Sequence, residues 1–241
     1  MILSDEACKR LVQRKLYTTP RNLSHFLSYM FGANTAINKN VLDVGGGAGV
    51  LCLAACVQGA RSGDCIDPEG DGSTPGTTTS FEANAQALSL TNARMIRTTF
   101  QDFEAPADKY DLIFIHNAIN HLDEAACIDL QKSEEARDAY RMIFDKLRRL
   151  LRPNGRVIIS DCGRSNAFGD RGIKSPLMPT IEWEKHQDPE VWVAAMEPSG
   201  FRLVRTQWSS FNSLGKPGRI LGNRPAAYLL LSHFRIELVA V

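Results

Sequence analysis

The chain has 241 residues, of which 44% are hydrophobic, enough to bury a sizeable core in one α/β domain with modest additions. Its 28 lysines and arginines nearly balance 27 aspartates and glutamates, which argues against a protein built to neutralise many nucleic-acid phosphates. The six cysteines form no C-x-x-C pair and no apolar run approaches ~18 residues, so zinc or other metal sites, redox sites and membrane spans are disfavoured and a cytoplasmic location is expected.

The predicted elements begin with two helical segments, at 5–17 and 22–31. Residues 1–39 are therefore expected to form an N-terminal helical region, and residues 40–241 the main domain. The main domain carries an unusually long connection at 162–187, rich in Gly, Pro and aromatic residues, which is typical of a lid or binding loop.

A glycine-rich turn follows the first predicted strand. Residues 41–50 read VLDVGGGAGV, that is, a short buried strand, a turn and the start of a helix. Gly45, Gly47 and Gly49 alternate in this turn, and glycine permits positive φ and close approach of a ligand. Such turns bind nucleosides in α/β proteins. A dinucleotide-binding turn would place a third glycine at position 50, where Val50 stands, so a nicotinamide cofactor is disfavoured.

A second strand is predicted at 63–69, and it carries several acidic residues. Asp67 lies roughly 20 residues beyond the glycine turn, where such folds place a carboxylate for ribose hydroxyls. A carboxylate can accept hydrogen bonds from both hydroxyls of a diol. Asp64 and Glu69 remain alternatives, because the end of a predicted strand is uncertain by a few residues.

The fourth strand, at 110–115, is a continuous β-branched and aromatic run, as expected for a strand buried on both faces. The segment HNAINHL at 116–122 follows it. The other elements are predicted in this order: a helix over 50–58, a low-complexity loop over 69–80 with Ser80 as a helix cap, a helix over 81–90, a strand over 93–98, a helix ending near 151, a strand over 157–161, a helix over 189–197, a strand from 200 and a last strand over 226–234.

These pieces, in this order, resemble the class I S-adenosylmethionine (SAM) dependent methyltransferases. Asp43 before G-x-G-x-G resembles motif I, and residues 116–122 resemble motif IV of the small-molecule branch. The phrase LRRLLRPNGRVII at 147–159 resembles the helix-turn-strand signature of the family. The resemblance implies a Rossmann-like, doubly wound, seven-stranded and mostly parallel sheet, with an antiparallel last strand and helices on both faces.

The resemblance also implies a cofactor site for SAM, which leaves as S-adenosylhomocysteine (SAH). The family often has an Asp directly after the third strand, where this chain has Thr99, so Asp102 or the apolar Phe100 is expected to meet the adenine instead. The cofactor-binding residues implied are Asp43, Gly45, Gly47, Gly49, Asp67, Phe100, Gln101, Asp102, His116 and Asn117.

The implied reaction is in-line methyl transfer to oxygen or nitrogen of a small molecule, with the 1–39 and 162–187 regions covering the cofactor and forming the acceptor pocket. His116 and His121 are the candidate general bases, because both follow the fourth strand. The site lacks the [DN]-P-P-[YF] motif of amide and adenine-amino methyltransferases. The alternatives are an RNA or protein methyltransferase, and a SAM-binding partner subunit without turnover; a homodimer is compatible with the sequence.

Overall fold

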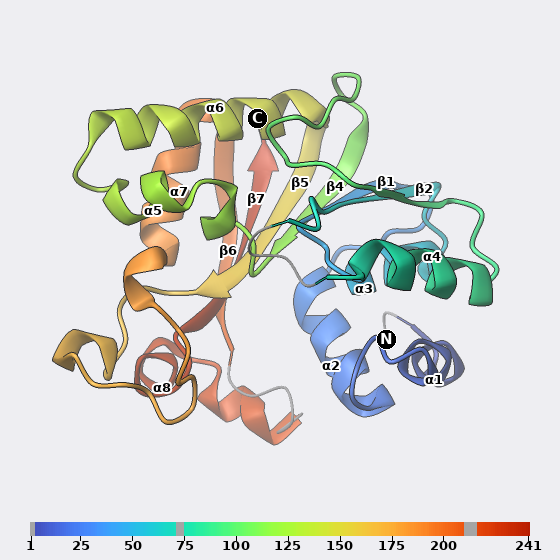
Figure 1. The fold of residues 1–241 in the computed structure, drawn as a ribbon, viewed down its shortest axis with the longest axis horizontal. Helices are drawn as coiled ribbons and strands as arrows, with labels where there is room; N and C mark the ends of the chain where they lie inside the picture. Colours follow the sequence, from blue (N-terminus) through green and yellow to red (C-terminus); the bar gives the residue numbers. More distant parts are fainter. Residues whose placement is uncertain (1–2, 71–74, 210–215) are drawn as a thin grey trace.

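A seven-stranded sheet forms the centre of the computed structural model, which describes residues 3–70, 75–209 and 216–241 (Figure 1). In sheet order the strands are β3 (Ala93–Ile96), β2 (Ser62–Ile66), β1 (Asn40–Val44), β4 (Tyr110–His116), β5 (Leu151–Cys162), β7 (His233–Ala240) and β6 (Phe201–Trp208). Among these strands only β7 is antiparallel to its neighbours, so the Rossmann-like fold implied by the resemblance is confirmed. The strand order reverses between β1 and β4, which is where open α/β sheets bind ligands.

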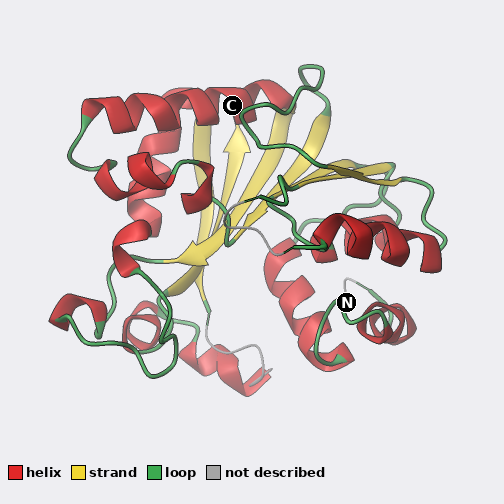
Figure 2. Cartoon of the chain, in the orientation of Figure 1, coloured by secondary structure: helices red, strands yellow, loops and turns green. Residues whose placement is uncertain are grey.

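Helices cover both faces of the sheet (Figure 2). One face carries α1 (Asp5–Gln13), α2 (Pro20–Phe31), α3 (Val50–Gln58) and α4 (Thr77–Ala87). The other carries α5 (Glu124–Asp129), α6 (Glu134–Leu150) and α7 (Pro189–Met196). The short elements between them are α8 (Arg224–Leu229) and the 3₁₀ turns η1 (Asn120–Leu122), η2 (Gly169–Arg171), η3 (Trp183–Lys185), η4 (Glu197–Ser199) and η6 (Lys216–Leu221).

The alternation of side chains along β4 divides the core into two layers. Leu112 and Phe114 pack with the α1–α4 helices, whereas Ile113 and Ile115 pack with the α5–α7 helices, and all four side chains are fully buried. This explains the continuous apolar run of the strand, because a parallel strand at the centre of such a sheet has no solvent-facing side.

The N-terminal helix α2 is bonded to the last strand, β7. The Nε atom of Arg235 donates to the backbone oxygen of Met30 at 3.0 Å, and Asn34 donates to Oε1 of Glu237 at 3.1 Å. Arg235 is fully buried and also pairs with Glu237 at 2.9 Å, while Arg156 of β5 contacts the same carboxylate at 2.6 Å. This ion-pair network holds α2 against β5 and β7.

The prediction for the last strand is wrong. Residues 226–234 were expected to form it, but most of them belong to α8 and the turn after it, and β7 starts at His233. The side chain of Asn223 caps α8 by accepting from the backbone N–H of Ala226 at 3.0 Å, and Pro225 lies in the first turn. An asparagine cap followed by proline favours a helix start, and this local signal outweighs the apolar run that follows.

Three smaller predictions also differ from the structure. The first helix ends at Gln13 rather than Tyr17, because Lys15 takes a left-handed conformation with φ of 59°. Helix α4 starts at Thr77 after Gly76, so Ser80 lies inside the helix and is not its cap. The fifth strand begins at Leu151, earlier than predicted. Part of the low-complexity loop, at 71–74, lies outside the described residues.

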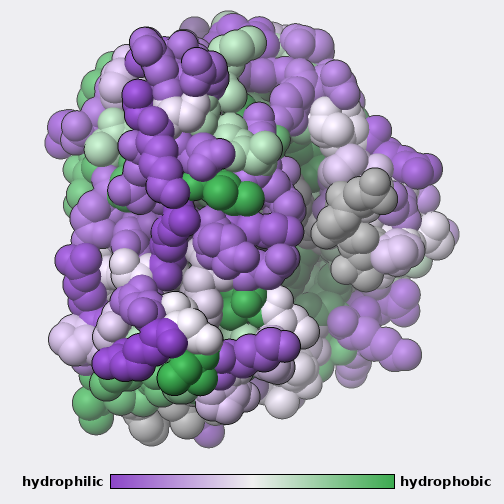
Figure 3. All heavy atoms as spheres, turned by 60° about the vertical axis from the view of Figure 1, so that its left-hand side comes forward, coloured by the Kyte–Doolittle hydropathy of each residue, from purple (hydrophilic) through white to green (hydrophobic). Residues whose placement is uncertain are grey.

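The surface seen in Figure 3 is mostly hydrophilic, with small and separate hydrophobic patches. Within the part of the chain that the structure describes, no helix combines the length and apolar character needed to cross a bilayer.

Candidate active site

The glycine turn after β1 is fastened to the end of β2. The backbone N–H groups of Gly45 and Gly46 both donate to the backbone oxygen of Ile66, at 2.9 and 3.3 Å. Gly45 has φ of 64°, and a Cβ atom there would lie 2.5 Å from the Cβ of Ala118, so only glycine fits. Gly47 has φ of 54°, but a Cβ atom there would meet nothing within 4 Å. The backbone of Gly47 therefore faces open space that a ligand can approach closely.

Asp67 lies directly after β2, beside this turn. Its Oδ2 accepts the N–H of Gly47 at 3.0 Å, and its Oδ1 accepts the N–H of Glu69 at 2.9 Å. Two backbone donors thus fix the carboxylate in place. Because an ionised carboxylate offers about four lone-pair positions, acceptor capacity remains for a diol.

The rival aspartate, Asp64, lies elsewhere. Its carboxylate accepts from Lys109 at 2.6 Å, Tyr110 at 2.7 Å and Arg94 at 3.0 Å, and these donors hold its pKa below the usual value despite burial. Asp64 is therefore part of a structural network between β2, β3 and β4.

Asp43 and Gly49 lie beneath the turn rather than on its open side. Oδ2 of Asp43 accepts the N–H of Cys52 at 3.1 Å, so this side chain caps the first turn of α3, where Gly49 stands at the N-cap and offers no side chain. Asp43 is only 1% exposed, and burial, together with the nearby Asp67 carboxylate, raises its pKa to about 7. The aromatic ring of Phe81 in α4 packs directly on Gly49.

The stretch after β3, where the adenine contact is expected, forms a tight turn. Thr99 and Asp102 bond each other twice, through the Thr99 hydroxyl donating at 2.8 Å and the Asp102 N–H donating at 3.0 Å. The amide of Gln101 donates to the backbone oxygen of Leu122 across the cleft. Phe100 is 3% exposed, with the ammonium of Lys146 5.6 Å from its ring centre.

The segment after β4 separates the two histidine candidates. His116 is turned toward α2: its ring lies 5.0 Å from that of Phe26 and 6.0 Å from that of His233. Burial and the neighbouring His233 lower the pKa of His116 to about 4. His121 lies at the cleft instead, with Nδ1 2.6 Å from Oε1 of Glu124. Between them, Asn117 has φ of 50° and donates its N–H to the backbone oxygen of Ser160 at 2.8 Å.

These parts line one cleft of about 730 Å³ at the carboxyl edge of the sheet. Seven of the predicted site residues line it: Gly45, Gly47, Asp67, Phe100, Gln101, Asn117 and His121. The other four, Asp43, Gly49, Asp102 and His116, lie behind or beside this lining. Leu122 and Glu124 also line the cleft and were not predicted. The spacing of His121 and Glu124, three residues apart at a helix start, is the signal that could have identified Glu124.

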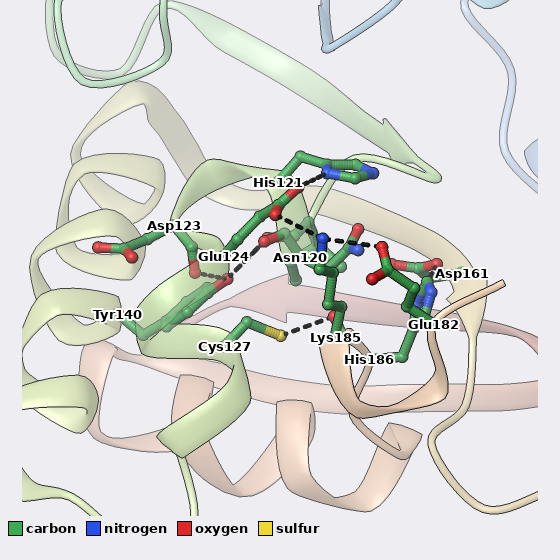
Figure 4. Close-up of polar contacts among 11 residues, drawn as sticks. Asn120, His121, Asp123, Glu124, Cys127, Tyr140, Asp161, Glu182, Lys185 and His186 are labelled. Carbon is green, nitrogen blue, oxygen red and sulfur yellow. Dashed lines mark hydrogen bonds and ion pairs between the residues drawn. The ribbon is translucent and has the colours of Figure 1, made fainter. Parts of the chain in front are cut away.

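The end of the insertion, residues 182–187, crosses the carboxyl edge of the sheet and is bonded to α5; we call it the strap (Figure 4). The ammonium of Lys185 lies 3.3 Å from Glu124 and 2.8 Å from Glu182. The thiol of Cys127 donates to the backbone oxygen of Lys185 at 3.3 Å, and Gln187 donates to the backbone oxygen of Cys127. The sequence indicated a lid at 162–187 but not these contacts.

A family model described as a methyltransferase domain matches residues 13–206. The chain belongs to this methyltransferase family. The resemblance to the class I SAM-dependent methyltransferases is thereby confirmed, and SAM is the cofactor of this methyltransferase. No curated protein sequence matches the chain.

Solved structures share the fold at low sequence identity. A SAM-dependent methyltransferase from Aquifex aeolicus is 17% identical, with a TM-score of 0.58 over 99% of this methyltransferase and 100% of that chain. A SAM-dependent methyltransferase from Mesorhizobium loti is 15% identical, with a TM-score of 0.59 over 89% and 95% of the two chains. A geranyl diphosphate methyltransferase in complex with GPP and sinefungin is 12% identical, with a TM-score of 0.62 over 90% and 76%.

The cleft suits a ligand of this kind. Its volume lies in the range of roughly 300–1,000 Å³ that is common for cofactor sites. It combines an open glycine backbone, a fixed carboxylate with spare acceptor capacity and, further along, the apolar Phe100 and Leu122. In the ranges that the structure describes, no group of three or more His, Cys, Asp or Glu side chains is arranged to hold a metal ion.

Proposed function

We propose that this methyltransferase transfers the methyl group of SAM to an oxygen or nitrogen atom of a small molecule. The observation that carries the proposal is the strap beside the cofactor cleft. Lys185 and Gln187 of the strap are bonded to Glu124 and Cys127 of α5, and Glu124 also lines the cleft. An acceptor that reaches the cleft from this side has to fit under the insertion, which suits a small molecule better than a polymer.

The basic residues of the molecule also favour a small acceptor over RNA. The cations of the basic cluster near the end of α6 have hydrogen-bond partners within the protein. Lys146 donates to Gln101, Arg148 to Val241, Arg149 to Ala105 and Arg152 to Asp108. A contact with phosphates would have to compete with these bonds, and the net charge of +1 supplies no broad attraction.

For the cofactor, we propose that Gly45 and Gly47 meet the methionine part, that Asp67 accepts from the ribose hydroxyls and that Phe100 contacts the adenine. SAM supplies an activated methyl group with a neutral leaving group, so alignment of the acceptor behind that group provides much of the rate. The chain's own residues then bind, orient and exclude water.

Of the two histidines, we propose His121 as the general base. It lines the cleft, and Glu124 fixes its Nδ1 at 2.6 Å, which leaves Nε2 to take up a proton from an acceptor. His116 is less suited, because its pKa of about 4 makes it a weak base and its ring packs against α2.

Calorimetric titration with SAH, with NAD as the control ligand, tests the cofactor site. Binding of SAH alone is expected. The Asp67→Ala variant should lose about 2–3 kcal/mol of binding free energy, because a charged acceptor for two hydroxyls is removed. The matched control is Asp145→Ala, an exposed aspartate on α6, which should bind SAH normally. Unchanged SAH affinity in Asp67→Ala would show that the ribose lies elsewhere.

Methyl transfer itself is tested with labelled SAM and a panel of small hydroxyl and amino compounds. A methylated product from the panel supports the proposal. Strong, salt-dependent RNA binding with methylation of RNA would instead favour the RNA alternative. Binding of SAH with no product from any acceptor would favour a partner subunit without turnover.

A further inference from the structure

Two buried oxygen atoms at the carboxyl edge of the sheet have no hydrogen-bond partner. They are Oδ2 of Asp161, at the end of β5, and Oδ1 of Asn120, at the start of η1. The two residues are only 2% and 1% exposed. Buried polar atoms of native proteins are normally bonded, because leaving them unpaired costs free energy. Two such atoms on adjacent connections therefore indicate a place where a ligand supplies the missing donors.

The backbone holds both residues firmly. Asn117 donates to the backbone oxygen of Ser160, which ties the segment after β4 to β5 immediately before Asp161. The hydroxyl of Tyr140 donates to the backbone oxygens of Ile119 at 2.9 Å and Asp123 at 3.2 Å, which fixes the turn that carries Asn120. The unpaired oxygens therefore do not result from a loose loop.

The strap closes over these side chains. Figure 4 shows the side chains of Asp161 and His186 close together, beside the strap. Nδ1 of His186 is 3.3 Å from Oδ1 of Asp161, but it is buried without a hydrogen bond. The same Oδ1 atom also accepts the backbone N–H of the next residue, Cys162, at 2.7 Å.

The group of atoms is rich in acceptors and poor in donors. Within the part of the chain that the structure describes, no lysine or arginine pairs with Asp161: Lys185 is held by Glu124 and Glu182, and Arg164 donates to the backbone oxygen of Ile128. A buried carboxylate beside a carboxamide oxygen is complementary to a ligand with positive charge and more than one N–H. A hard metal ion would need more oxygen ligands than one carboxylate and one amide.

We propose that Asp161 and Asn120 form the subsite that binds an amino group of the methyl acceptor, so that the acceptor is a small amine. The proposal rests on the proposed function, because it concerns the acceptor of the same reaction. The subsite adjoins the cofactor cleft, since Asn117, Ala118 and His121 of that cleft are neighbours of Asn120 in the chain. The strap, with His186, closes the subsite on the outer side.

The test is calorimetric titration of SAH-saturated protein with small primary amines, each paired with the alcohol of the same skeleton: propylamine, benzylamine and phenethylamine against propanol, benzyl alcohol and phenethyl alcohol. At least one amine should bind, and its alcohol should bind about tenfold more weakly or worse, because the alcohol lacks the charge. Failure of all the amines to bind, or equal affinity for amine and alcohol, would overturn the proposal. Failure of SAH to bind in the first step would instead reject the proposed function.

Two variants test the residues. In Asp161→Asn and Asn120→Ser the preference for amine over alcohol should fall by about tenfold, while SAH affinity stays within about twofold. The matched control is Asp188→Asn, because both carboxylate oxygens of Asp188 already accept bonds from Ser165. This control should keep the amine preference. An amine preference that survives in Asp161→Asn would contradict the assignment.

Stability of the free protein separates a binding role from a structural one. The Asp161→Asn substitution keeps the oxygen that accepts from Cys162 and places a donor where an unpaired oxygen now lies. The denaturant midpoint of Asp161→Asn should therefore equal or exceed that of the wild type. Asp188→Asn should lower it, because bonds to Ser165 are weakened. A large loss of stability in Asp161→Asn would show that Asp161 is structural.

Discussion

Asp43, Asp64 and Asp67 lie on two neighbouring strands or directly after them, but they meet different partners. Asp67 receives backbone donors at the open side of the glycine turn, Asp64 is surrounded by cationic and phenolic donors, and Asp43 caps α3 beneath the turn. Spacing from the turn favoured Asp67 in the sequence. The donors to Asp64 come from residues 30 to 46 positions further along the chain, whereas Asp43 bonds to Cys52, nine positions away in α3.

Gly47 gives the sharpest prediction for the cofactor site. A Cβ atom there meets no protein atom within 4 Å, so Gly47→Ala should obstruct a bound ligand rather than the fold. We expect SAH affinity to fall at least about tenfold. Gly172→Ala is the matched control, because Gly172 also has positive φ and nothing within 4 Å but lies in the insertion. Both variants should lose similar stability, of order 1 kcal/mol, from the left-handed conformation. Equal SAH affinity in the two variants would contradict this reading.

Asp43 should make stability depend on pH. Burial raises its pKa from 3.8 to about 7 in the folded state, so between these values the folded protein binds more protons than the unfolded chain. Stability contributed by this group therefore falls as pH rises from about 4 to 7 and is level above that. Asp43→Asn keeps an acceptor for Cys52 and cannot ionise.

The measurement is the free energy of unfolding of Asp43→Asn minus that of the wild type, by denaturant titration at several pH values. This difference should rise by a few kcal/mol at most between pH 5 and 7 and then stay constant. Taking the difference removes the titration of other groups. A difference that is independent of pH over this interval would show that Asp43 ionises normally.

At the level of elements, the sequence predicted best those helices and strands whose ends are set by residues close together in the chain. The helix over 50–58 and the strand at 110–115 were placed almost to the residue. Residues 226–234 were wrongly predicted as a strand because their apolar run fits a strand as well as a helix. The capping of α8 by Asn223 favours the helix. The strap could not be predicted, since its contacts join residues 58 and 60 positions apart, with α6 and β5 between them in the chain.

Lys185 links the strap to α5, and its removal should loosen the strap without unfolding the protein. Its partners Glu124 and Glu182 are 41% and 58% exposed, and ion pairs at such positions contribute little to global stability. Lys185→Met should therefore keep the unfolding midpoint but raise hydrogen exchange in residues 182–187 severalfold. Lys174→Met, an exposed lysine of the same insertion, is the control and should leave that exchange unchanged. Equal exchange in the two variants would show that Lys185 does not hold the strap.

For the whole molecule, the resemblance carried by the ordered motifs implied the sheet and its antiparallel last strand, and seven of the predicted site residues line one cleft at the carboxyl edge of that sheet. It did not predict which candidates face the cleft. His116 ends β4 and His121 lies five residues later, yet His116 is buried against α2 and His121 lies in the cleft. That difference depends on Phe26 and His233, which come from the two ends of the chain.

Substitution of Arg235 tests how much the contact between the two ends of the chain contributes to the stability of the fold. Arg235→Met should destabilise the fold by about 3–5 kcal/mol, because it leaves the buried Glu237 with fewer partners. The Arg235→Met/Glu237→Met double variant should recover part of this loss. The control is Arg224→Met, whose exposed pair with Glu190 should contribute no more than about 1 kcal/mol. Denaturant unfolding measures all three. A loss in Arg235→Met no larger than in the control would show that the network is dispensable.

The bond between Met30 and Arg235 joins residues 205 positions apart, and this separation has a consequence in time. At about 5–20 residues per second, a ribosome needs roughly 10–40 s to get from one to the other. During that interval the backbone oxygen of Met30 lacks the donor that β7 supplies, although the apolar side chains of α2 already have early partners such as Val41 and Leu51. The polar link between the two ends of the chain is therefore made last, after α2 can pack on β1 and α3.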